Sequence, residues 1–152
     1  MKDGLKANLK RLGRLVQIRD TYVSVAEAGV KRAETEVRKL EAEDREAVGN
    51  IQDTQAGIAY MKAAKGKDLQ TCEKYIKALE RPRQLIQQSL EIAVGNLEQR
   101  RGEWTEAKRE QKIAAKLQER RLHQLEREDD VTQQKSQDDV SVARYVRTRL
   151  EK

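Results

Sequence analysis

The sequence of 152 residues contains no phenylalanine and only one tryptophan, one proline and one cysteine. Aromatic residues make up 3% of it, too few for the core of an ordinary globular domain of this length. No stretch of about 18 consecutive apolar residues occurs, so we expect no membrane-spanning helix. The lone cysteine, Cys72, excludes an intramolecular disulfide.

Motifs that mark catalytic or nucleotide-binding sites are also missing. His123 is the only histidine, and no cysteine or second histidine stands near it at metal-ligand spacing. The patterns GxxxxGKS/T, GxGxxG and GxSxG do not occur. Acidic pairs such as Glu43-Asp44 lie in charged sequence that is typical of solvated helix faces. We therefore expect no enzyme activity, no cofactor and no metal.

What the sequence does contain is a seven-residue hydrophobic repeat in two long stretches. With Leu9 as position a, apolar residues fill 13 of the 16 a and d positions up to Met61. With Leu69 as position a, they fill 10 of 12 up to Ala107. This spacing predicts helices that wind around each other as a left-handed coiled coil. Four charged residues interrupt the repeat at a or d positions: Arg19, Asp44, Arg83 and Arg100. A polar residue at such a position can fix the register of the two helices, or its side chain can extend out of the seam into solvent. For the three arginines we favour extension into solvent.

The predicted fold is all-α, a long antiparallel two-helix coiled-coil hairpin that forms a single domain over residues 1–152. We place one helix at about 5–62, a loop at about 63–68 and a second helix at about 69–150. Gly66 is the expected residue after the first helix and Asp68 the expected N-cap of the second. Pro82 is expected to bend the second helix without ending it. A short connection makes the two helices antiparallel neighbours.

The hydrophobic seam weakens after Ala107. Ile113, Leu117 and Leu125 suggest that the stripe shifts there, as it does after a stutter. Folding the hairpin places Leu9 opposite about 118–121, so residues beyond about 126 have no partner in the chain. An apolar stripe nevertheless returns near the end, and we expect this C-terminal extension of the helix to bind a partner; its residues are Val142, Val146 and Leu150.

The net charge of +6 is spread unevenly. Residues 1–19 carry six basic residues and one acidic residue, a net charge of +5, whereas residues 20–61 carry five basic and nine acidic residues. The basic end favours an acidic partner. Nucleic-acid binding is disfavoured, because basic residues alternate with acidic ones and no aromatic residues are interleaved for base stacking.

The string RLVQIRDTYVSVAEAGVKRAETEV at 14–37 resembles the opening of type III secretion stalk proteins, the YscO/HrpO family and its flagellar relative FliJ. Leu15, Ile18-Arg19 and Ala26-Glu27 fill the places of the family pattern. The C-terminal half follows the same family in the strings GEWTEAKREQK, KLQERRLHQLERE and QDDVSVARYVR. The pair Asp138-Asp139 stands where the family usually has a Gln-x-Asp-Glu-like pattern.

This resemblance implies a non-enzymatic stalk at the cytoplasmic base of a bacterial type III secretion apparatus. Its expected partners are the hexameric export ATPase, a membrane protein of the export gate and secretion chaperones, with the isolated protein a monomer. The expected ATPase-binding residues are Lys10, Arg11, Arg14, Arg19, Val142, Arg144, Val146, Arg147 and Leu150. The expected residues for the gate or a chaperone, at the tip, are Tyr60, Met61, Leu69, Tyr75, Ile76 and Leu79.

Two other functions remain open on the sequence alone. A passive structural coiled coil would form a homodimer through its seam, which a measurement of the oligomeric state detects. A basic rod that associates with nucleic acid would bind less tightly as salt rises.

Overall fold

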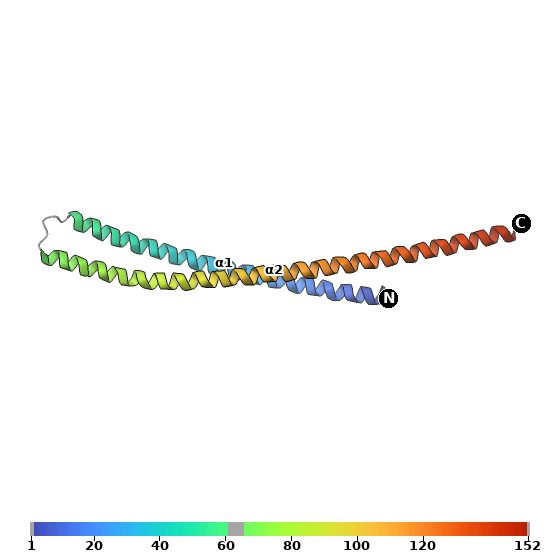
Figure 1. Cartoon of the computed structure of the whole chain (residues 1–152), viewed down its shortest axis with the longest axis horizontal. Coiled ribbons are helices and arrows are strands. Elements are labelled where there is room, and N and C mark those ends of the chain that lie inside the picture. The colour runs from blue at the N-terminus through green and yellow to red at the C-terminus, as the bar shows by residue number, and fades with distance from the viewer. Residues whose placement is uncertain (1, 61–65, 152) are drawn as a thin grey trace. The chain divides into compact units, whose positions relative to one another are not determined.

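The computed structural model describes residues 2–60 and 66–151, with side chains described for 3–59 and 70–151. Helix α1 spans Lys2–Tyr60 and helix α2 spans Gly66–Leu150. The two helices run in opposite directions, and no strand occurs among the described residues. The predicted all-α antiparallel hairpin is therefore confirmed (Figure 1).

The predicted boundaries next to the connection are only partly described. Helix α1 is described up to Tyr60 and α2 from Gly66, earlier than the predicted start at about 69, and the predicted end of the first helix at about 62 lies outside the described residues. Gly66 is thus the first residue of α2, and its assignment as the residue that follows α1 is wrong. Asp68 lies inside α2 rather than at its N-cap.

Contacts within the chain divide it into two compact units. Unit 1 combines residues 1–23 of the chain with 106–152, and unit 2 contains residues 24–105. In each unit a segment of α1 packs against a segment of α2. The assignment of all 152 residues to a single domain stays a prediction.

Unit 2 holds the larger hydrophobic core. Small and branched side chains alternate along it, so the two helices can approach closely while Leu90 and Trp104 pack against the cluster. Burial of apolar surface contributes about 25 cal/mol per Å², so a core with this many alanines stabilises the pair only modestly. The buried cluster consists of Val30, Ala33, Val37, Leu40, Ala93 and Leu97.

The seven-residue register holds along almost the whole hairpin. Every a and d position of α1 from Leu9 to Ile58 is buried or half-buried, as the heptads predict. In α2 the same is true from Cys72 to Glu128, with the single exception of Arg100. Pro82 lies within α2 without ending it, which confirms that it marks no boundary.

The predicted stutter after Ala107 is wrong. Ile113 is 60% exposed and Leu117 is 39% exposed, so neither belongs to the seam. The unshifted register instead places Gln111 and Gln118 against α1, around the buried Ala114. Nε2 of Gln111 donates a hydrogen bond of 2.6 Å to Oδ1 of Asp20. A glutamine with such a partner can occupy a seam position that hydrophobicity alone would reject.

Candidate partner-binding surfaces

The last part of α2 has no cover from the rest of unit 1. Every residue from Val131 to Glu151 is exposed, and in Figure 1 this segment extends beyond the start of α1. Val142 is 62% exposed and Leu150 is 80% exposed. Together with Val146 they lie at i, i+4 and i+8, on one face of the helix. The structure thus leaves the predicted C-terminal stripe open to solvent.

Positive charge accompanies this stripe. Arg147 and Arg149 lie in the last turn of α2, where cations interact favourably with the negative end of the helix dipole. The guanidinium of Arg149 lies 5.8 Å from the ring centroid of Tyr145, which is itself exposed. Arg144 is also exposed. The segment therefore offers apolar and cationic groups to the same partner.

The predicted ATPase-binding residues of α1 fall into two groups, exposed residues and one residue that binds α2. Lys10, Arg11 and Arg14 are exposed and make no ion pair with any described residue. Arg19 is half-buried, and its Nη1 donates a short hydrogen bond to Oε2 of Glu110 on α2. Its guanidinium also lies 5.9 Å from the ring centroid of Tyr22. Arg19 therefore joins the two helices, and only the other three are freely accessible.

The structure does not gather the predicted ATPase-binding residues into one patch. Lys10 to Arg19 pair with the part of α2 near Glu110 and Gln118, since Gly13 lies against the Gln118 side chain. Val142 follows Glu128, the last half-buried a or d residue, by 14 residues, or about 20 Å along the helix axis. A partner that contacts both sets must extend along unit 1.

Of the residues predicted to contact the gate or a chaperone, some pack in the seam between the helices and others are exposed on the surface. Ile76 and Leu79 are half-buried at a and d positions, so they pack against α1. Tyr75 is 56% exposed and can meet a partner directly. Met61 lies outside the described residues, and the side chains of Tyr60 and Leu69 lie outside the described side chains.

Two of the polar seam residues pair with each other in unit 2. Nε of Arg83 donates a hydrogen bond of 3.3 Å to Oδ1 of Asp44, and their side chains are 38% and 23% exposed. Arg100 instead turns outward and pairs with Glu103 at 3.3 Å. Extension into solvent, predicted for all the seam arginines, is therefore correct for Arg100, whereas Arg19 and Arg83 bind the opposite helix.

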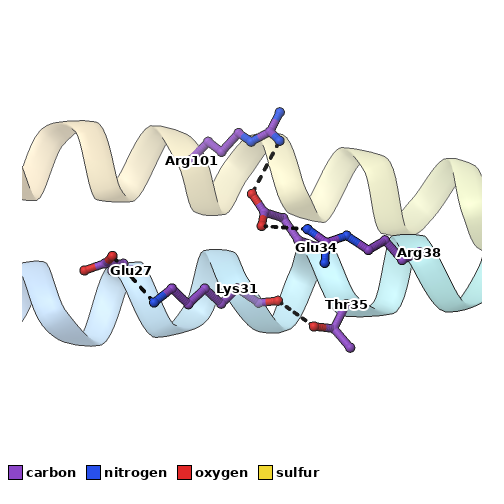
Figure 2. A network of polar contacts seen from close by, with 6 residues as sticks. All are labelled: Glu27, Lys31, Glu34, Thr35, Arg38 and Arg101. Carbon is purple, nitrogen blue, oxygen red and sulfur yellow. Dashed lines mark hydrogen bonds and ion pairs between the residues drawn. The ribbon is translucent and has the colours of Figure 1, made fainter.

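A second cross-helix network lies on the surface of unit 2 (Figure 2). The carboxylate of Glu34 on α1 forms an ion pair with Arg101 of α2 at 3.6 Å and another with Arg38 of its own helix at 3.7 Å. Nζ of Lys31 lies 3.7 Å from Glu27, and the Lys31 carbonyl accepts a hydrogen bond from Thr35. Exposed pairs of this kind contribute about 0–1 kcal/mol each, so they orient the helices more than they stabilise them.

The net charge of the chain is confined to unit 1. Unit 1 contains 18 Lys and Arg residues and 12 Asp and Glu residues, a net charge of +6, whereas unit 2 contains 14 of each. Unit 1 also holds the start of α1 and the exposed end of α2. An acidic partner is therefore attracted to unit 1.

No group of three or more His, Cys, Asp or Glu that could hold a metal ion occurs in residues 2–60 and 66–151. Neither helix, over its described length, has a stretch apolar enough to cross a bilayer. The prominent functional features are thus surfaces along the helices.

Comparison with known families supplies the assignment. The model of the family described as flagellar FliJ protein matches residues 9–150. The chain belongs to the FliJ family. Proteins of this family are structural components of an export apparatus rather than enzymes, in agreement with a chain built from two paired helices. No curated protein and no solved structure gives a significant match.

Proposed function

We propose that this FliJ-family protein is the central stalk of a bacterial type III secretion apparatus of the YscO/HrpO kind. It binds the hexameric export ATPase through unit 1 and couples it to the export gate in the cytoplasm. Secretion chaperones are further candidate partners at the tip. Family membership over residues 9–150 supports the export role.

The observation that carries the ATPase contact is the exposed C-terminal segment of α2. Its apolar stripe, Val142, Val146 and Leu150, is left uncovered by the described part of the chain, and Arg147 and Arg149 flank it, whereas Arg144 lies on the opposite face of the helix. An amphipathic helix of this kind can enter an apolar groove and place its arginines on acidic side chains or helix C-termini. The exposed Lys10, Arg11 and Arg14 add positive charge to the same unit.

The contact with the gate or a chaperone is assigned to residues 60–79, around the connection between the two helices. Tyr75 is the best-supported member, because its ring is exposed in a region of charged residues. Ile76 and Leu79 support it from the seam. Tyr60, Met61 and Leu69 remain predictions.

Truncation after Asp130 tests the ATPase contact. The hairpin should keep its melting temperature, because residues 131–151 contribute no buried side chain. Stimulation of the cognate ATPase should fall to near the basal rate. The substitution of Val142, Val146 and Leu150 by serine should have the same effect, whereas Val140→Ser, on a 50% exposed residue about 120° around the helix from Val146, should have none. Full stimulation by the truncated protein would exclude this segment as the docking element.

A further inference from the structure

One side of unit 1 carries apolar side chains that lie outside the seam. Ile18 is 49% exposed and Tyr22 is 55% exposed, and Leu15 stands beside them on α1. Ile113 and Leu117 are the exposed apolar residues of the adjoining part of α2. We call these five residues the lateral face. A contiguous exposed apolar patch often marks a site where a partner binds.

The contacts of Arg19 show that both sets lie on the same side of the hairpin. Its guanidinium binds Glu110 of α2 and also covers the ring of Tyr22 of α1. Leu15 lies seven residues before Tyr22, and Leu117 lies seven residues after Glu110. In each helix the two residues share a heptad position, and therefore a face.

The hydrogen bond between Gln111 and Asp20 belongs to the other side of the seam. Asp20 precedes Tyr22 by two residues, or about 200° around the helix, so the two side chains point away from each other. Ile18 and Ile113 lie between the residues of their respective rows, half a heptad from each neighbour. The lateral face thus consists of two adjacent apolar rows, one about 10 Å long on α1 and one about 6 Å long on α2.

Unneutralised positive charge surrounds the lateral face. Arg11 and Arg14 of α1 and Lys116 and Arg120 of α2 are exposed, and none of the four forms an ion pair with a described residue. Acidic residues nearby are already engaged. Glu110 binds Arg19, and Glu106 lies 3.9 Å from Arg109.

We propose that the lateral face binds an amphipathic helix of a partner protein, one with an apolar stripe flanked by Asp and Glu. The apolar rows fit the stripe, and the four free cations fit the acidic flanks. A second copy of this chain is a poorer occupant, because its own unit 1 would bring another charge of +6 to the contact. The apolar residues of this surface are distinct from the C-terminal stripe that we assign to the ATPase, while Arg11 and Arg14 are candidates for both contacts.

A synthetic peptide can test the proposal. The probe is a fluorescein-labelled helix of about 18 residues, long enough to be partly helical, with leucine at every third or fourth position and glutamate elsewhere. Its control is an isomer of the same composition whose leucines are spread around the helix. The full chain should bind the probe at least tenfold more tightly than the isomer in fluorescence anisotropy, and the affinity should fall as salt rises.

Two double variants locate the binding site. Ile18→Ser with Ile113→Ser should weaken probe binding at least tenfold, while helicity and melting temperature stay unchanged because both side chains are exposed. The matched control, Leu85→Ser with Ile92→Ser, removes two exposed apolar residues of unit 2 and should leave binding intact.

Three results would overturn the proposal. Equal binding of probe and isomer would mean that charge alone attracts the peptide. Equal binding to the first double variant and the wild type would place the site elsewhere. A wild-type dimer in sedimentation equilibrium that this variant dissociates would make a second copy the occupant. None of these bears on the ATPase contact, whose failure appears instead as undiminished stimulation by the chain truncated after Asp130.

Discussion

At the scale of single residues, polar groups within the seam specify how the helices align. Asp44 and Arg83 interrupt two hydrophobic repeats that are otherwise interchangeable from one heptad to the next. Their hydrogen bond of 3.3 Å forms only when the two positions face each other. A shift by one heptad would leave both charges against apolar neighbours, which is unfavourable. The pair thus selects one register from several that the apolar residues permit.

Substitutions of Asp44 and Arg83 test whether the pair contributes mainly to the register of the helices or to the stability of the protein. Asp44→Ala should lower the free energy of unfolding by about 1 kcal/mol, since the partly exposed Arg83 loses its partner but can still reach water. Asp44→Leu with Arg83→Leu should raise it by about 1–2 kcal/mol, because apolar burial replaces a desolvated ion pair. Urea denaturation followed by circular dichroism measures both. A double variant less stable than Asp44→Ala would show that the pair is a major source of stability.

A second residue-scale prediction tests the register of α1. Ala26 is half-buried at a d position of unit 2, whereas Glu36 is exposed. Ala26→Asp should destabilise the protein by about 1–3 kcal/mol, because it places an unpaired carboxylate in the seam. Glu36→Gln should change stability by less than about 0.5 kcal/mol. Equal melting temperatures for the two variants would contradict the assigned register.

At the scale of the elements, α2 carries a proline that costs it stability. Pro82 has no N–H to donate to the carbonyl of Ala78, and its ring crowds the preceding turn. The apolar register on both sides of Pro82 keeps the helix continuous. Helix continuity therefore depends on packing against α1 rather than on local propensity.

Pro82→Ala should stabilise the hairpin. Restoring the hydrogen bond and removing the clash is worth up to about 3 kcal/mol. The greater freedom of the unfolded chain offsets about 0.4–1 kcal/mol of this. The control is Ser89→Ala, one heptad further along the same exposed row, which should raise stability by only a few tenths of a kcal/mol. Thermal melting compares the two, and a lower melting temperature for Pro82→Ala would mean that the proline has a structural role.

How far the elements could be predicted depended on the strength of the apolar repeat. In α1 every seam position with a described side chain followed from the heptads, because apolar residues fill most of them. In α2 beyond Ala107 the seam contains Gln111, Gln118 and Arg121, and hydrophobicity pointed instead to the exposed Ile113 and Leu117. The seam position of Gln111 is supported by its hydrogen bond to Asp20 of α1, and a single sequence does not reveal such a bond.

At the scale of the whole molecule, the uneven distribution of charge favours unit 1 over unit 2 as the unit that binds acidic partners. All the net positive charge lies in unit 1, and unit 2 is neutral. The exposed C-terminal stripe is predicted from the sequence. The lateral face is not, because the sequence pattern assigns Ile113 and Leu117 to a shifted seam between the helices. Only the pairing of the helices shows that these two residues stand beside Ile18 and Tyr22 on one surface.

The stoichiometry of the complex with the ATPase tests the central claim most directly. A stalk that occupies the pore of a hexamer has room for one copy, so native mass spectrometry of the purified proteins should show six ATPase subunits with one chain. The same mixture made with the chain truncated after Asp130 should show the ATPase alone. A complex with six copies of the chain, or with a dimer of it, would contradict the account.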